Sequence, residues 1–151
     1  MGKKKLFSTF VSYYKPHYKL FFLDMSCALL IALIDLFFPM LTRQVIGTVL
    51  PAGQMGTFWL FVSAMLLMYI IRTVFQYIVQ YWGHVLGVRI EYDMRRDLFS
   101  HLQTLPFKFF DKNRTGHLMS RIVNDLNEIA EFAHHGPEDL FLSVIMLVGS
   151  F

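Results

Sequence analysis

The chain has 151 residues, of which 55% are hydrophobic and 17% aromatic, and its mean hydropathy is +0.45. A soluble domain of this size cannot easily bury several long apolar runs, because small proteins have much surface for their volume. The composition therefore argues against a soluble protein and favours a membrane protein. The net charge is +3, but the basic residues are divided along the chain, whereas a nucleic-acid-binding protein gathers them on one soluble face. We therefore expect no nucleic-acid partner.

The positions of the basic residues predict the orientation of the chain in the membrane. Five lysines precede the first apolar run, and seven of the other nine basic residues lie between Arg89 and Arg121. The segment Gln44–Gly56, which separates the first two apolar runs, carries no charge. Because cytoplasmic segments of membrane proteins are enriched in lysine and arginine, we expect a multi-pass protein of the cell membrane with a cytoplasmic N-terminus.

Residues 1–16 are expected to form an elbow helix that lies in the membrane interface and contacts lipid. The apolar side chains that share one side of this helix are Leu6, Phe7, Phe10, Val11 and Tyr14. The three lysines at its start would face anionic headgroups, and Pro16 would end the helix. The alternative is a frayed basic tail.

The first transmembrane helix is expected at residues 17–46. Its apolar core, Leu20–Leu41, contains two acidic residues. Asp24 lies near the inner end and is expected to reach the interface, whereas Asp35 lies deeper, where an acid costs about 2.5–3.5 kcal/mol on insertion. An acid within the membrane normally faces protein or a wet cavity. We therefore expect Asp35 either to hydrogen-bond to a neighbouring helix or to line a substrate pathway.

Residues 57–105 are predicted to form one helix that is too long for the membrane. The half Thr57–Val79 is apolar, with Arg72 its only formal charge, while Gln80–Leu105 is rich in charged residues. Apolar residues nevertheless continue at a spacing of four through this second half, at Trp82, Leu86, Ile90, Met94, Leu98 and Leu102. No proline, which would end or kink the helix, occurs between Pro51 and Pro106. At 1.5 Å per residue the helix is about 70 Å long, over twice the roughly 30 Å hydrocarbon core, so we expect it to extend into the cytoplasm.

Polar residues follow one face of this helix within its apolar half. Gln76 and Gln80 lie four and eight residues after Arg72, which places all three on one side. A stripe of this kind favours helix partners or a substrate pathway over a lipid-facing surface. Arg72 itself is expected either to line a cavity or to pair with an acid on a neighbouring helix.

Residues 106–124 are expected to form an intracellular loop. An aromatic run is followed by a polar turn at Asn113-Arg114 and then by a short helix, Thr115–Arg121, with Thr115 as its N-cap. Asp125 and the glutamate three residues later resemble a capping box, which predicts that another helix starts there.

That next helix, residues 125–151, is expected to begin a third transmembrane span. Its apolar run, Leu140–Phe151, has about a dozen residues, fewer than the roughly 20 that a crossing requires. We therefore expect this all-α membrane polypeptide to be the N-terminal piece of a larger protein.

The intracellular loop carries a recognisable pattern of residues. They are Phe109-Phe110-Asp111, Thr115-Gly116, Leu118, Ser120-Arg121 and Asn124-Asp125. Placed directly after an overlong helix, this pattern resembles the first intracellular loop of ABC exporters, whose transmembrane domain is of type I. The resemblance covers nearly the entire chain. One departure is Gly47, where many relatives have an acidic residue before the outer turn.

The resemblance implies a coupling helix that docks on a nucleotide-binding domain, in the same or a partner chain. Its residues would be Thr115, Gly116, His117, Leu118, Met119, Ser120 and Arg121. Asn124-Asp125, together with Arg121, would brace the helix bundle beside it. The resemblance also implies a half-transporter that dimerises with an identical or different second half. The long helices would then transmit the motion of the ATP-binding domains to the substrate cavity.

The sequence contains no residues that indicate chemistry within this chain. There is no G-x-x-x-x-G-K-[ST] loop to hold phosphates, so we expect no catalytic residue and no cofactor here. ATP and Mg are expected for the missing nucleotide-binding domain of a parent that hydrolyses ATP. Cys27 is the only cysteine, which excludes disulfides within the chain and a cysteine-based metal cluster.

A metal site built from histidines is also not expected. His134-His135, with His117 and His101, would be the candidates, but they lack a carboxylate or cysteine at ligand spacing. Two other functions remain open from the residues alone. One is a stand-alone membrane hairpin that acts as a scaffold or regulatory subunit, and the other is a soluble helical binding module.

Overall fold

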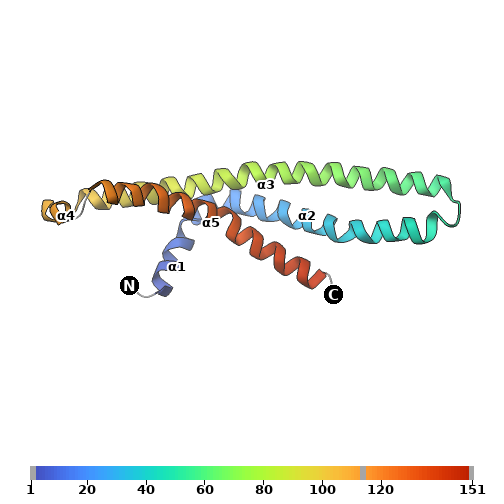
Figure 1. The fold of residues 1–151 in the computed structure, drawn as a ribbon, viewed down its shortest axis with the longest axis horizontal. Helices are drawn as coiled ribbons and strands as arrows, with labels where there is room; N and C mark the ends of the chain where they lie inside the picture. Colours follow the sequence, from blue (N-terminus) through green and yellow to red (C-terminus); the bar gives the residue numbers. More distant parts are fainter. Residues whose placement is uncertain (1–2, 113–114, 150–151) are drawn as a thin grey trace. The chain divides into compact units, whose positions relative to one another are not determined.

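The computed structural model describes residues 3–112 and 115–149, and the side chains of residues 7–110 and 116–149. Within these ranges the chain is helical and contains no strand. The elements are α1 (Lys3–Ser12), the 3₁₀ turn η1 (Lys15–His17), α2 (Tyr18–Gln44), the π-helical turn η2 (Val45–Val49), α3 (Met55–Gln103), α4 (Phe107–Lys112) and α5 (Thr115–Gly149) (Figure 1). The all-α prediction is therefore confirmed.

Helix α3 is a single helix of 49 residues, which confirms the prediction of one continuous helix over residues 57–105. At 1.5 Å per residue it is about 73 Å long, and Figure 1 shows it without a break. It ends before Pro106, and Thr104 caps its last turn by donating a hydrogen bond to the His101 carbonyl at 2.7 Å. The glycines Gly83 and Gly87 therefore do not interrupt it.

Two stretches, Phe7–Val49 and Met55–Gln103, are long and apolar enough to cross a membrane. They are joined by a turn in which Gly53 has φ of +66°, a left-handed conformation that side chains disfavour. Glycine at this position therefore allows the two apolar stretches to form a tight hairpin.

The described chain forms two compact units. Unit 1 contains the residues up to Phe22 together with Trp82–Pro137, and unit 2 contains Leu23–Tyr81 together with the residues from Glu138 onward. The core of unit 1 consists of Leu86, Ile90 and Ala133, against which Phe10, Tyr13, Tyr14, Leu20, Phe21 and Met94 pack. The core of unit 2 consists of Cys27, Ala28, Ile31 and Val79, with Phe75, Ile78 and Leu142.

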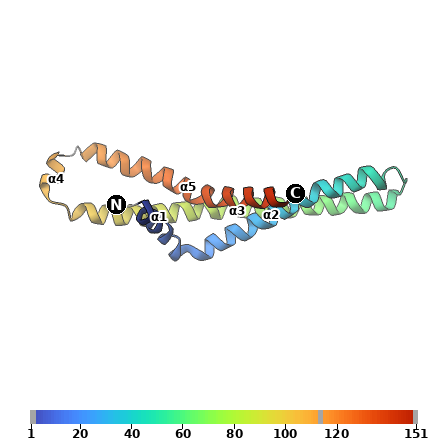
Figure 2. The same ribbon diagram turned by 90° about the horizontal axis from the view of Figure 1, so that it is seen from below.

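Within unit 1, α3 and α5 come into very close contact. A Cβ atom added at Gly87 would lie 2.8 Å from the Ala130 carbonyl oxygen, closer than real Cβ atoms approach. Small residues on both helices thus allow the backbones to meet. Towards α4 the same two helices separate (Figure 2).

One sequence prediction about the loop is wrong. A short helix over Thr115–Arg121 and a new helix start at Asp125 were expected, but α5 runs without interruption from Thr115 to Gly149. No proline or glycine occurs in residues 117–135, and Arg121 lies 3.4 Å from Asp125 as an i,i+4 pair. Asp125 therefore supports the middle of a helix instead of capping a new one. The predicted turn at Asn113-Arg114 lies outside the described residues, and α4 precedes it.

Candidate functional site

The two costly charges of the apolar helices bind each other within unit 2. The Arg72 Nε donates to Asp35 Oδ1 at 2.6 Å, and Arg72 Nη2 donates to Asp35 Oδ2 at 3.0 Å. The interhelical pairing that the sequence offered as one interpretation of each residue is therefore present. A bidentate pair of this kind is among the strongest hydrogen-bonded arrangements, and it removes most of the cost of two charges in an apolar region.

A cavity of about 430 Å³ lies beside this ion pair. It is lined by Ile34, Asp35, Phe38, Pro39, Tyr69 and Arg72. The pair thus lies at the wall of an open space between α2 and α3 and is not sealed inside the packing.

The predicted pathway residue Gln76 does not join this cavity and is exposed on α3. Tyr69, Thr73 and Gln80 are also exposed. At 100° per residue these four positions fall within about 60° of one another on the helix. They form a narrow polar stripe, called here the α3 polar stripe, on a part of the helix that is otherwise apolar apart from Arg72.

The expectation for Asp24 is wrong. Its side chain does not reach an exposed position, because the residue is only 1% exposed. Glu138, at the start of the α5 segment of that unit, is also buried, and carboxylate oxygens of the two residues lie within 4.8 Å of each other. Asp24 is therefore placed by contact with α5, which the first apolar run alone could not reveal.

The elbow segment, which we define as residues 7–17, is attached to α3 and α5 of unit 1 by polar contacts of Tyr13, Tyr14 and His17. The Tyr13 hydroxyl donates to Asp97 Oδ2 at 3.1 Å, and His17 Nε2 lies 2.9 Å from Asp93 Oδ2. The Tyr14 hydroxyl donates to the Ala133 carbonyl at 2.8 Å. Both α3 and α5 are thereby joined to the segment that follows α1.

Aromatic packing strengthens the same attachment and differs in part from the expected interfacial arrangement. The Phe10 ring packs against Tyr14 and Phe132, with centroids 5.5 and 5.9 Å apart. Phe7 and Val11 remain exposed, at 70% and 44%. One part of the predicted apolar side therefore contacts protein, and only the other part is exposed.

The predicted coupling residues form the first two turns of α5 and are largely open. Gly116, His117, Met119, Ser120 and Arg121 are exposed, whereas Leu118 is half-buried. The Thr115 side chain lies outside the described residues. Next to these turns a groove of about 400 Å³ separates α3 from α5, lined by Tyr92, Arg95, Arg96, Phe99, Met119, Ile122 and Val123.

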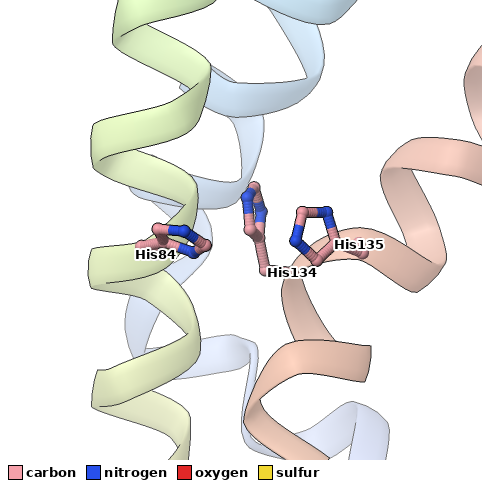
Figure 3. Close-up of side chains that lie close together, drawn as sticks. All are labelled: His84, His134 and His135. Atoms are coloured by element: carbon pink, nitrogen blue, oxygen red, sulfur yellow. The ribbon is translucent and has the colours of Figure 1, made fainter.

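The histidines group differently from the sequence-based expectation. His134 and His135 lie beside His84 of α3, which was not among the candidate histidines expected from the sequence (Figure 3). Neither His101 nor His117 belongs to this cluster. A contact between α3 and α5 across fifty residues leaves no signal in local spacing, so only the fold could identify it.

A comparison with known families decides the classification. The model of the ABC transporter transmembrane region matches residues 21–151. The chain belongs to this family. Its transmembrane region accounts for the two long apolar helices and places the protein in a membrane.

Individual relatives agree with this membership. An uncharacterized ABC transporter ATP-binding protein of Bacillus subtilis, YwjA, is 49% identical over 142 residues, which cover 94% of this chain and 25% of the relative. A putative multidrug export ATP-binding/permease protein of the same organism, YgaD, is 27% identical over 154 residues, covering 98% and 26%. A putative multidrug export ATP-binding/permease protein of Staphylococcus aureus is 31% identical over 85 residues, covering 56% and 15%. The chain thus spans about a quarter of the length of the first two relatives.

Proposed function

We propose that this chain is the transmembrane-domain segment of an ATP-driven exporter that couples movement of an ATP-binding domain to the substrate pathway. The observation that carries the proposal is the exposed start of α5, which follows an uninterrupted α3 and the short α4. An exposed helical surface beyond a helix longer than the membrane is suited to receive a partner in the cytoplasm. The ATP-binding domain would bind ATP and Mg, and the chain itself would carry out no bond-making chemistry.

The packing of unit 1 supports a mechanical role. The close contact of α3 with α5 at Gly87 and the core around Leu86 and Ile90 join the two helices firmly. Closely packed interiors have low compressibility and transmit displacement. A push on the residues Thr115–Arg121 would therefore move α3 and α5 together instead of bending one of them.

The α3 polar stripe is proposed to face the substrate pathway. Polar side chains such as Gln76 and Thr73 are unfavourable against lipid, and they are exposed in this chain. In the complete domain they would face other helices or a wet passage. Two of the relatives are named as putative multidrug export proteins, so we propose amphipathic organic molecules as the cargo, bound by amide and phenol groups beside apolar surface.

The remaining partners follow from the same proposal. A second half-transporter, identical or different, would complete the pathway. The N-terminus would lie in the cytoplasm, because the basic residues concentrate before α2 and in the second half of α3 and beyond.

Cysteine crosslinking in the full-length transporter tests the docking step. Met119→Cys, which is 48% exposed in the proposed docking turns, is introduced into a background without native cysteines, including Cys27→Ala. A second cysteine is scanned over the surface of the ATP-binding domain. The matched control is Met55→Cys. Met55 is 58% exposed and lies at the start of α3, far along that helix from the proposed docking turns of α5.

We expect a disulfide from Met119→Cys to the ATP-binding domain and none from Met55→Cys. Adding ATP should change the yield of the crosslink, because docking surfaces move during the cycle. If no domain position crosslinks to residue 119, or if both variants crosslink equally, the proposed docking is wrong.

A further inference from the structure

Three imidazole side chains from two helices converge in unit 1. His84 lies on α3, His134 and His135 are consecutive on α5, and one nitrogen of each lies within 4.8 Å of the other two. The ring centroids are 5.0 Å apart for His84 and His134, and 4.4 Å apart for His134 and His135. Figure 3 shows the His134 ring between the other two.

Acidic side chains lie next to these rings. A Glu131 carboxylate oxygen is 3.6 Å from His135 Nε2. A cavity of about 270 Å³ is lined by His84, His134, Glu131 and Glu91, among others. The expectation that these histidines have no carboxylate at ligand spacing is therefore wrong for the folded chain, because Glu131 lies beside His135. Imidazole nitrogens and a carboxylate are the ligands that Zn²⁺ prefers in proteins besides thiolate.

The three rings differ in how firmly they are held. His134 is 2% exposed, and its ring lies directly against the backbone of α3 at Gly83. A Cβ atom at Gly83 would be 1.8 Å from His134 Cε1, so only glycine leaves room for the ring. His84 and His135 are exposed and can therefore admit an ion from solvent.

The spacing of the nitrogens is close to that of a zinc site. Zn–N bonds of about 2.0–2.1 Å in a tetrahedral site place the ligand nitrogens about 3.4 Å apart. The observed limit of 4.8 Å requires a small contraction. Rotation of the two exposed rings towards the fixed His134 ring can supply it.

We propose that His84, His134 and His135 bind one Zn²⁺ ion, with Glu131 or water as the fourth ligand. Because the ligands come from α3 and α5, a bound ion crosslinks the two helices within unit 1. This site lies outside the proposed transport function and does not depend on it.

Zinc binding by the purified full-length transporter tests the proposal. The protein carries an affinity tag without histidines, contains no nucleotide, and is titrated with Zn²⁺ against a chromophoric chelator. The variants are His84→Ala and His135→Ala, whose side chains are exposed, so the core of unit 1 is retained. His101→Ala, an exposed histidine outside the cluster, is the matched control. The thermal unfolding temperature of each variant is measured with and without Zn²⁺.

We expect one Zn²⁺ site per chain that His84→Ala and His135→Ala each weaken about tenfold or more, while His101→Ala leaves it unchanged. Zn²⁺ should raise the unfolding temperature of the wild type and of His101→Ala, but not of the two cluster variants. The proposal is overturned if the wild type and all three variants bind Zn²⁺ equally. It is also overturned if the wild type has no Zn²⁺ site that is lost in His84→Ala and His135→Ala. Without zinc the variants should unfold at the wild-type temperature, which confirms that a loss of binding is not a loss of fold.

Discussion

At the scale of single residues, the ion pair of Asp35 and Arg72 is the main polar contact between the two apolar helices of unit 2. The two hydrogen bonds, at 2.6 and 3.0 Å, make each residue dependent on the other. Loss of one partner leaves the other charge uncompensated, which costs more than loss of both. The pair therefore predicts strong non-additivity between substitutions.

A double-mutant cycle with Asp35→Asn and Arg72→Gln measures this coupling in the full-length transporter. We expect each single variant to lower the unfolding temperature, and the double variant to lower it by less than the sum of the two single effects. The corresponding coupling free energy between the two residues should be about 0.5–3 kcal/mol. Arg43→Gln, an exposed arginine near the end of α2, is the control and should have little effect. Additive effects of the two substitutions would show that the residues do not bind each other.

At the scale of the elements, the elbow segment is attached to α3 through two aspartates spaced four residues apart. Asp93 contacts His17 and Asp97 accepts from Tyr13, so both acids lie on one face of α3. Hydrogen bonds of this kind each contribute about 0.5–1.5 kcal/mol. The attachment of α1 should therefore weaken when both acids are neutralised.

Hydrogen exchange measures that weakening. In the double variant Asp93→Asn/Asp97→Asn we expect amides of residues 7–12 to exchange about tenfold faster, since about 1.4 kcal/mol changes an opening equilibrium tenfold. Glu91→Gln is the matched control, because Glu91 pairs with Arg95 of the same helix and not with the elbow. Unchanged exchange in the double variant would show that the aromatic packing alone holds α1.

The helices themselves were largely predictable from the sequence, and their contacts were not. The length of α3 follows from the four-residue apolar spacing and the absence of proline between Pro51 and Pro106, which are local signals. The error at Asp125 arose because an i,i+4 partner inside a helix and a capping residue at its start use the same amino acids. The grouping of His84 with His134, and the pairing of Asp35 with Arg72, depend on which helix faces align, and a single sequence contains no measure of that.

At the scale of the whole molecule, the chain belongs to the family of ABC transporter transmembrane regions and spans about a quarter of the length of the first two relatives. Two stretches are long and apolar enough to cross a membrane, and α3 continues for over twenty residues beyond its apolar half, Thr57–Val79. Transport by the proposed mechanism requires this helix to stay intact where it leaves the membrane. A break there would absorb any displacement that begins at the start of α5.

The most direct measurement is a spin-label scan of α3 from residue 76 to residue 100, omitting Gly83 and Gly87, in the full-length transporter in lipid bilayers. Accessibility to oxygen and to a water-soluble relaxation agent is recorded at each position. The account predicts an unbroken period of about 3.6 residues through both glycines, with the exposed face changing from oxygen-accessible to water-accessible after Trp82. Loss of the period between residues 83 and 87, or oxygen accessibility that persists along residues 88–100, would contradict it, because the helix would then break or lie against lipid.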